Sequence, residues 1–527
     1  MAQVIILSDV VSGALYGASR YVGPYALCAQ LREHGYSTVV VDYISKNPDL
    51  FSYLKNFLGP ETLVVGVSST FLNPPFKSEK NSLSYDLLIQ QNRGELLFES
   101  GSELLAWSAG LKNLMKTLAP KARLVLGGAK AIGAFSNPQF YKDFDYICIG
   151  AGDDSLLNLV RDLESGQEPG AIEKKGLRIL KNIQLKTTQG ICPDARLGRL
   201  DGIQRQESLP IEISRGCIFN CKFCYYEKKA SIKKNPEILR SEFIRNYEMF
   251  GTTTYHFTDD CFNDHREKVE TYCEMFLRLP FKIEWVSYAR VDVAVKFPHT
   301  IDLMVESGAR ALFWGIESLN AEVARQAGKG TPTELVKRFL IEFKKEYSDR
   351  CLTAGSFITG LPGESFESLR RTKDFLCEND VFDIINVNPL IFSPYNESLD
   401  LKVIDYADYS RNPKKYGFEE LRINSRPPHY WRHSEMDSYQ AHDIAIKMYE
   451  EWRRVHHRGP VRSVFNYPHL RTLGFSHEEI TRAIRSDEGV DSFLEEGHNR
   501  FNRFLKGYFN LLLKSNSAQD SMASKDL

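Results

Sequence analysis

Three cysteines in one short turn place the strongest constraint on this chain. Cys217, Cys221 and Cys224 follow the apolar segment Leu209–Ile213 with the spacing C-x3-C-x2-C. Three thiolates at this spacing suit three irons of a [4Fe–4S] cluster, which normally takes four cysteine ligands. The next cysteine along the chain is Cys261. The triplet therefore predicts a metal site, a cluster whose fourth iron is open to a small molecule.

A structural zinc site and a disulfide are the alternatives. Zinc sites usually pair C-x2-C with a second pair of cysteines or histidines, and the nearest histidine, His256, lies far downstream. A disulfide is disfavoured because Met1–Leu7 resembles a buried strand rather than a secretory signal. We expect a cytoplasmic protein in a reducing compartment, where the thiolates are free to bind iron.

The triplet, with Phe223 before its last cysteine, resembles the signature of radical S-adenosylmethionine (SAM) enzymes. The resemblance runs from Leu209 to about Leu399. It implies that the open iron binds SAM through its amino and carboxylate groups. It also implies that one electron, from a donor such as flavodoxin or ferredoxin, yields a 5′-deoxyadenosyl radical. In such enzymes the cofactor carries the chemistry and the protein supplies positioning and exclusion of water.

The first 165 residues alternate short apolar runs with helical patterns. The runs Val4–Leu7, Thr38–Val41, Leu63–Val67, Leu124–Leu126 and Tyr146–Ile149 predict buried strands. The first helix is expected over 23–34, closed by Gly35. This alternation predicts an α/β fold that begins with a doubly wound, Rossmann-like domain over residues 1–165.

In layout, this domain resembles the cobalamin-binding domain that precedes many radical SAM cores. The family's Asp-x-His-x-x-Gly motif is absent, because the only histidine in this half is His34. A polar insertion over residues 73–105 would also crowd the same crevice. We therefore expect an enzyme that is active without cobalamin, although a corrinoid held without a histidine ligand stays open.

The rest of the chain divides into four parts. Residues 166–208 are expected to be a linker, and residues 209–400 a partial (β/α)6 barrel that forms the radical SAM core. Its strands are expected at 211–214, 254–258, 283–288, 311–315, 354–358 and 384–388. Residues 401–514 are expected to be mainly helical, with a disordered tail over 515–527. The stretch 421–471, rich in arginine and histidine, is either a cap that binds an anion or, slightly favoured, a solvated helical face.

Polar residues follow several of the barrel strands, where a barrel enzyme binds its ligands. By the resemblance, Asp259 and Asp260 would accept hydrogen bonds from the SAM ammonium; a helix N-cap by one of them is the alternative. Arg290 would pair with the SAM carboxylate, or else form a structural salt bridge with Asp292.

Two further strand ends complete the expected SAM site. Gly315, Glu317 and Ser318 resemble the family's Gly-x-Glu-Ser, whose polar pair contacts the ribose or the amino-acid end of SAM. Gly360 would let the backbone approach the adenine, although a plain turn also uses Pro-Gly. At Ser393–Glu397 the chain departs from the Pro-Gly-Thr turn of relatives that have cobalamin-type domains, which leaves the substrate pocket open.

Composition excludes little beyond this. The net charge of the 527 residues is −1, which indicates neither nucleic acid nor a membrane surface as a partner. No apolar run is long enough to span a bilayer. The leading hypothesis is hydrogen abstraction that isomerises or rearranges a small molecule, amino-acid-like or nucleotide-like, or modifies a polymer. The alternatives are cobalamin-dependent radical methylation and a non-catalytic iron–sulfur or zinc protein.

Overall fold

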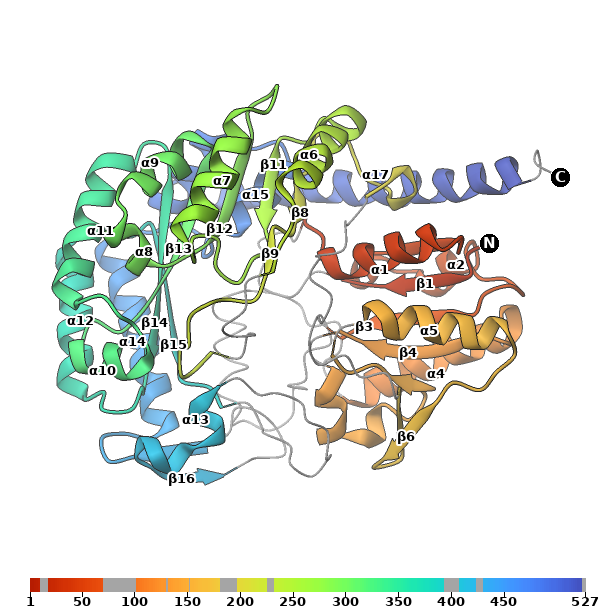
Figure 1. Cartoon of the computed structure of the whole chain (residues 1–527), viewed down its shortest axis with the longest axis horizontal. Helices are drawn as coiled ribbons and strands as arrows, with labels where there is room; N and C mark the ends of the chain where they lie inside the picture. The colour runs from red at the N-terminus through yellow and green to blue at the C-terminus, as the bar shows by residue number, and fades with distance from the viewer. Residues whose placement is uncertain are drawn as a thin grey trace.

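The computed structural model describes residues 1–9, 18–69, 101–128, 131–150, 152–180, 197–224, 232–392, 407–422 and 430–523. Most of the insertion expected at 73–105, and the turn at Ser393–Glu397, lie outside these residues. Two α/β units stand side by side, and C-terminal helices pack against both (Figure 1).

The N-terminal unit is a doubly wound sheet, as predicted. Its parallel strands are β1 (Val4–Leu7), β2 (Thr38–Val41), β3 (Val64–Ser68), β4 (Arg123–Gly127) and β5 (Tyr146–Ile147), in the order β2-β1-β3-β4-β5. Alternate residues point to opposite faces, so Val4 and Ile6 join a different core from Ile5 and Leu7. Helices α1 (Val22–Glu33) and α5 (Asp153–Glu164) cover one face, and α2 (Leu50–Leu54) and α4 (Gly101–Leu118) cover the other.

The segment expected to be a linker adds two strands to this sheet. β6 (Ala171–Lys174) and β7 (Leu177–Leu180) form an antiparallel hairpin, and β7 also pairs with β5. The turn is Lys175-Gly176, both with positive φ, the conformation that a two-residue hairpin requires. This hairpin was not predicted from the sequence, because β6 shows little apolar pattern and carries the exposed Glu173.

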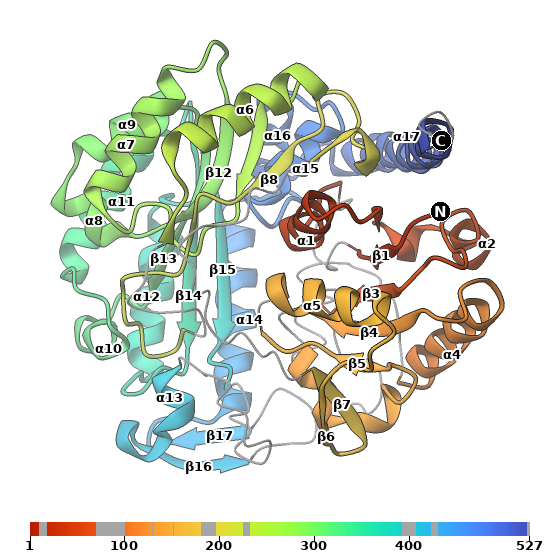
Figure 2. The same ribbon diagram turned by 45° about the vertical axis from the view of Figure 1, so that its right-hand side comes forward.

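The second unit is the predicted partial barrel. Its six parallel strands are β8 (Leu209–Ile211), β11 (Thr254–Phe257), β12 (Glu284–Ala289), β13 (Ala309–Glu317), β14 (Leu352–Thr359) and β15 (Ile384–Pro389). Each strand pairs with the next in chain order, and β8 and β15 are the two edges. The helices between them, which lie outside the sheet (Figure 2), are α6 (Pro236–Phe250), α7 (Arg266–Leu277), α8 (Val291–Lys296), α9 (His299–Glu306), α10 (Ala321–Ala327), α11 (Thr333–Tyr347) and α12 (Phe366–Glu378).

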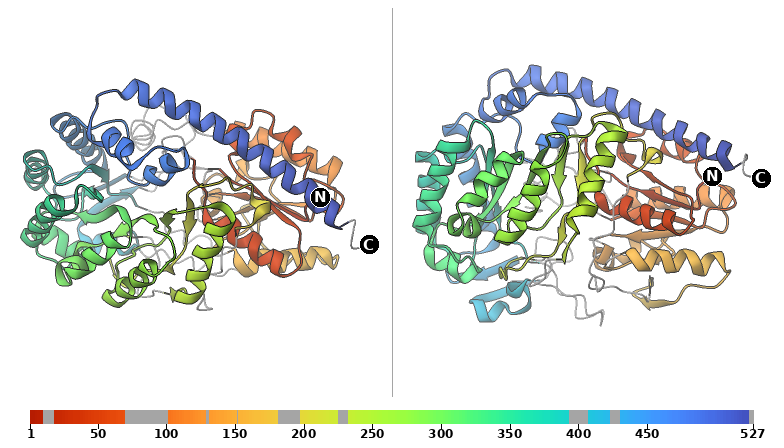
Figure 3. Two further views of the ribbon diagram at one scale, coloured as in Figure 1. Left: turned by 90° about the horizontal axis from the view of Figure 1, so that it is seen from above. Right: turned by 45° about the horizontal axis from the view of Figure 1, so that its top comes forward.

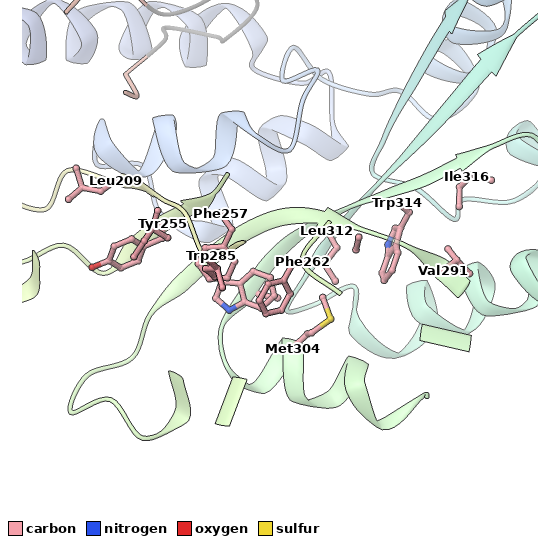
Figure 4. Close-up of a cluster of buried hydrophobic side chains, with 14 of the residues drawn as sticks. Leu209, Tyr255, Phe257, Phe262, Trp285, Val291, Met304, Leu312, Trp314 and Ile316 are labelled. Atoms are coloured by element: carbon pink, nitrogen blue, oxygen red, sulfur yellow. The ribbon is translucent and has the colours of Figure 1, made fainter. Parts of the chain in front are cut away.

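Strand alternation separates the core of the barrel from its interior. On β13, Leu312, Trp314 and Ile316 face the surrounding helices. They belong to one buried cluster with Trp285 of β12 and Met304 of α9 (Figure 4). Trp285 and Trp314 are fully buried, and truncation of such a side chain to alanine typically costs about 3–5 kcal/mol. The intervening residues of β13, among them Gly315 and Glu317, face the barrel interior. The same pattern that builds the core therefore points the polar residues inward.

The C-terminal region is mainly helical, as predicted, with an added hairpin. Its elements are α13 (Asp408–Arg411), β16 (Phe418–Arg422), β17 (Tyr430–His433), α14 (Ser438–Val455), α15 (Asn466–Thr472), α16 (His477–Arg485) and α17 (Val490–Ala523). Short 3-10 helices occur at Ile44–Lys46, Ala131–Ser136, Pro138–Phe140, Arg199–Asp201 and Pro413–Tyr416. From the arginine- and histidine-rich stretch, Trp431, His433, His442 and His469 are buried. These residues therefore pack against the barrel, whereas Arg422 and Arg432 of the same stretch are exposed to solvent.

Helix α17 connects the two units. It runs from the barrel across the N-terminal sheet (Figure 3), where the Tyr508 hydroxyl lies 2.8 Å from the backbone N–H of Asp42. The carbonyl of Phe504 accepts a hydrogen bond from Gln204. The helix continues to Ala523, so the tail expected to be disordered from 515 is helical over most of its length, because extending an existing helix costs little. None of the helices in the described parts of the chain combines the length and apolar composition that a bilayer crossing requires.

Candidate functional site

The three cysteines line one cavity at the carboxyl ends of the barrel strands. The cysteine turn follows β9 (Ser214–Arg215), which pairs with β10 (Ile232–Lys233), and Gly216 allows it to leave the strand at φ +80°. The cavity measures about 460 Å³. Its other lining residues are Phe223, Asp260, Cys261, Tyr288, Ala289, Arg290, Phe313, Gly315, Glu317, Lys329, Ser356, Ile358, Asn388, Pro389, Leu390 and Ile391.

The cavity lies near the carboxyl edge of the N-terminal sheet. Arg215, two residues before the first cysteine, pairs with Asp153 across 3.7 Å. Asp153 is the first residue of α5, just after the loop that leaves β5. Both sheets therefore present their carboxyl edges to the space beside the cysteine turn, which is where ligands bind in each of these folds.

The structure separates the two neighbouring carboxylates. Asp259 is buried outside the cavity lining, where its oxygens accept hydrogen bonds from the backbone of Ile213, the hydroxyl of Ser214 and the amine of Lys268. Asp260 lines the cavity. Burial and the charge of Asp259 raise the pKa of Asp260 to about 7, opposed by the backbone N–H of Gly216. Asp259 thus holds the strand before the cysteines, and Asp260 faces the ligand space.

Arg290 lies between the cysteine turn and the following loops. Nη2 of Arg290 lies 2.6 Å from Oδ2 of Asp292, so the salt bridge that the sequence offered as an alternative is present. Nη1 also lies 2.8 Å from Cys221 Sγ. Asp292 in turn accepts hydrogen bonds from the backbone of Gly330 and Thr331. Arg290 therefore links the cysteines to the segment 328–331.

Within the Gly-x-Glu-Ser segment, Gly315 and Glu317 line the cavity, whereas Ser318 does not. Glu317 adopts φ +70°, a conformation that costs a non-glycine residue about 1–2 kcal/mol, and its carboxylate meets Lys329 at 3.3 Å and the Ser356 hydroxyl at 3.0 Å. A Cβ on Gly315 would lie 2.9 Å from the Glu317 carboxylate. Gly315 therefore leaves room for the Glu317–Lys329 pair.

Ser318 and Gly360 do not line the cavity. The Ser318 hydroxyl lies 3.4 Å from Glu364. A Cβ on Gly360 would lie only 2.2 Å from the indole of Trp431. Side-chain packing from the C-terminal hairpin therefore fills the space that glycine leaves, where the sequence analysis expected an adenine.

Four further polar residues of the cavity wall were not predicted from the sequence: Cys261, Lys329, Ser356 and Asn388. Ser356 and Asn388 lie on inward positions of β14 and β15, so strand periodicity alone would have indicated them. Lys329 lies in the loop after α10, and only the tertiary structure brings it to Glu317. Cys261 lies 44 positions beyond Cys217, yet both line the same cavity.

Comparison with known proteins agrees with this architecture. The model of the radical SAM superfamily matches residues 211–376. An uncharacterized methyltransferase of Pyrococcus horikoshii is 27% identical over 173 residues, which make up 32% of this chain and 36% of that protein.

Two methyltransferases of Chlorobaculum tepidum also match. The bacteriochlorophyllide d C-12(1)-methyltransferase is 24% identical over 231 residues, 41% of this chain and 49% of that protein. The C-8(2)-methyltransferase is 20% identical over 308 residues, 54% and 65% of the two chains. In these curated relatives the chain spans between about a third and two thirds of their length.

Solved structures extend the likeness to almost the whole chain. TsrM from Kitasatospora setae, a radical SAM methyltransferase with tryptophan and a SAM analogue bound, has a TM-score of 0.59 at 14% identity and covers 96% of this chain and 99% of its own. The cobalamin-dependent radical SAM enzyme OxsB has a TM-score of 0.55 at 14% identity, covering 99% and 84%. At this identity the likeness concerns the fold.

Residues 211–376 therefore form a radical SAM domain, as the cysteine triplet predicted. In fold, the chain is similar to TsrM and OxsB over almost its whole length. A radical SAM domain uses a [4Fe–4S] cluster and SAM, which favours an enzyme over the non-catalytic alternative.

Proposed function

We propose that this chain is a cobalamin-dependent radical SAM methyltransferase. The observation that carries the proposal is the position of the cysteine-lined cavity beside the carboxyl edge of the N-terminal sheet, joined to it by Arg215 and Asp153. Methyltransferases recur among the similar proteins, which favours this proposal over the isomerisation ranked first from the sequence.

The residues of the cavity fit a cluster and SAM. Cys217, Cys221 and Cys224 supply three thiols to one space of about 460 Å³. Among the residues proposed to hold SAM, Asp260 would accept a hydrogen bond from the SAM ammonium. Glu317, Lys329 and Ser356 form another polar part of the cavity wall. When bound, the cluster and SAM supply reductive radical chemistry and a corrinoid supplies a methyl carrier. The apolar side chains Phe313, Ile358 and Leu390 exclude water around them.

Glycines lie at two strand ends of the N-terminal edge, where the proposed corrinoid would bind. Gly127 ends β4 and Gly128 follows it, and Gly150 follows β5; Gly128 and Gly150 have φ of +98° and +86°. Such backbone brings N–H groups close to a ligand without side chains in between. The missing histidine motif, which led us to expect activity without cobalamin, is outweighed by the whole-chain likeness to a cobalamin-dependent enzyme.

The test is anaerobic reconstitution of the full chain with iron, sulfide and hydroxocobalamin, followed by desalting. We expect one corrinoid per chain in the visible spectrum. With SAM and a low-potential reductant such as reduced flavodoxin, we expect S-adenosylhomocysteine beside 5′-deoxyadenosine. A protein that loses all corrinoid on desalting and releases 5′-deoxyadenosine alone would contradict the proposal and restore direct hydrogen abstraction.

A triple variant provides the control for the ligand assignment. Changing Cys217, Cys221 and Cys224 together to alanine should remove the iron and both SAM products and leave corrinoid retention unchanged. Cys351→Ala, at a buried thiol just before β14, should behave as wild type. The substrate is proposed to be a small or modified molecule; the lining of the cavity does not name it.

A further inference from the structure

The guanidinium of Arg290 contacts a proposed cluster ligand directly. Nη1 lies 2.8 Å from Cys221 Sγ, and the group stacks over Phe219 with 3.8 Å between the guanidinium carbon and the ring centre. Nε and Nη2 bind Asp292, and Nη2 also lies 3.4 Å from the carbonyl of Gly328. These contacts use four of the five N–H donors of an arginine. The side chain is buried, so its orientation is fixed before any ligand binds.

A hydrogen-bonded unit holds Arg290 in this position. The thiol of Cys261 donates to Asn263 Oδ1 across 3.5 Å. Asn263 holds the backbone of Arg290 on both sides, accepting from its N–H at 2.7 Å and donating to its carbonyl at 2.8 Å. Lys268 donates to the Cys261 carbonyl at 3.0 Å. Arg290 and Cys261 therefore belong to one rigid hydrogen-bonded unit.

The contacts of Arg290 are directed at Cys221, Asp292 and Gly328. A hydrogen-bond donor to a metal ligand tunes that ligand and the metal behind it. The guanidinium therefore faces the proposed ligand shell, and the SAM carboxylate expected from the resemblance is the alternative that the test below separates.

We propose that Arg290 is a positioning residue that sets the reduction potential of the cluster through Cys221, assisted by Cys261, which supports Arg290 through Asn263. Hydrogen bonds to the sulfurs and nearby charge are among the factors that set iron–sulfur potentials. A cationic donor stabilises the more negative, reduced cluster more than the oxidised one. The contact therefore makes the cluster easier to reduce. The inference rests on the proposed ligand assignment of the three cysteines.

The test is a redox titration of the reconstituted, SAM-free protein, followed by electron paramagnetic resonance. Without SAM, a role in binding its carboxylate cannot contribute to the potential. In Arg290→Gln we expect the reduced cluster to lose about tenfold in relative stability, a shift of 59 mV to more negative potential for a one-electron couple. Arg290→Lys, which keeps the charge and loses the forked contacts, and Cys261→Ala should shift the potential less, in the same direction.

Matched controls use an exposed arginine and a distant thiol. Arg325→Gln removes a guanidinium that pairs only with Glu322 on α10, and Cys351→Ala removes a buried thiol. Both should keep the wild-type potential. Should Arg290→Gln fail to hold iron, Arg290→Lys and Cys261→Ala decide the question.

Unchanged potentials in Arg290→Lys and Cys261→Ala, at full iron content, would overturn the inference. A wild-type potential in Arg290→Gln combined with weakened SAM binding would overturn it in favour of a SAM-carboxylate role. Neither result affects the proposed function, which fails instead if the triple cysteine variant keeps its iron.

Discussion

The two parallel sheets of this chain end differently at the edges that approach each other. The described strand ends of the barrel carry chemically specific side chains, among them Cys217, Asp260, Arg290 and Glu317. In the N-terminal sheet, β1 and β2 are followed by the buried acids Asp9 and Asp42, whereas the next three strand ends carry small residues: Ser68 and Ser69 at the end of β3, Gly127 and Gly128 at the end of β4, and Gly150 after β5. At these three ends a proposed corrinoid would be held by shape and backbone, in contrast to the charges and thiols of the barrel.

The difference also shows in the buried charges. In the N-terminal unit Arg20 pairs with Glu207, and Arg32 pairs with Asp201, so these charges fix the junction between the sheet and the chain that leads to the barrel. In the barrel, Asp259 and Lys268 support the cysteine turn. The buried pairs Arg20–Glu207 and Arg32–Asp201 therefore hold the two units together, whereas the pair Asp259–Lys268 holds the site.

The largest expected effect separates two adjacent aspartates. Asp259→Asn removes one of the two buried carboxylates beside Lys268, the other being Asp264, and weakens the support of the strand before the cysteines. It should cost about 3–4 kcal/mol, with loss of iron. Asp260→Asn should keep the cluster and bind SAM about tenfold more weakly, the loss of one charge-assisted hydrogen bond. Thermal unfolding, iron content and SAM calorimetry measure the three quantities. Equal stability, iron content and SAM affinity in the two variants would contradict the separate roles of Asp259 and Asp260.

The next effect tests a buried carboxyl that has no cationic partner among its hydrogen bonds. Burial raises the pKa of Glu364 to about 7, and its partners Ser318 and Ser368 are neutral. Because the folded pKa exceeds the unfolded one, its contribution to stability is lost as pH rises from about 4.5 through 7, by on the order of 3 kcal/mol.

Glu364→Gln removes this titration. The melting temperature of the variant relative to wild type should therefore increase between pH 5 and pH 8. A difference between the two proteins that does not change with pH would show that Glu364 has an ordinary pKa.

A smaller effect is expected at the segment that packs on the cysteine turn. Gly328 has φ +93°, and a Cβ there would lie 3.1 Å from the Cα of Cys221. Gly328→Ala should cost about 1–2 kcal/mol and lower the iron content by moving Cys221. Gly133→Ala in the N-terminal unit, where a Cβ meets nothing within 4 Å, is the control and should match wild type. Full iron in Gly328→Ala would mean that the turn adapts.

The smallest effect is expected at the pair that joins the two edges. Arg215 and Asp153 are partly exposed, with side-chain exposures of 23% and 20%, and pairs of this kind contribute about 0–1 kcal/mol. Arg215→Gln should therefore unfold nearly as wild type does and release corrinoid about twofold faster. Arg278→Gln, in an exposed pair within α7 and its C-terminal turn, serves as the control. Complete loss of corrinoid in Arg215→Gln would make this pair an essential joint.

The sequence determined the elements and the cluster chemistry. Apolar runs of strand length located β1 to β5 of the first unit and, to within a few residues, the six strands of the barrel, since burial on both faces of a parallel sheet leaves a local signal. The cysteine triplet is local as well, because one turn supplies all three thiols. The hairpin β6–β7 was not predicted because the edge strand β6 has no buried residue.

Only the tertiary structure decided the surroundings of the ligands. Arg290 reaches Cys221 across 69 positions of the chain, and Cys261 lines the same cavity as Cys217 across 44. The fold also buried Asp259 outside the cavity lining and filled the space beside Gly360 with Trp431. A sequence pattern records which face of its own strand a residue occupies, whereas these contacts depend on where separate strands and loops meet.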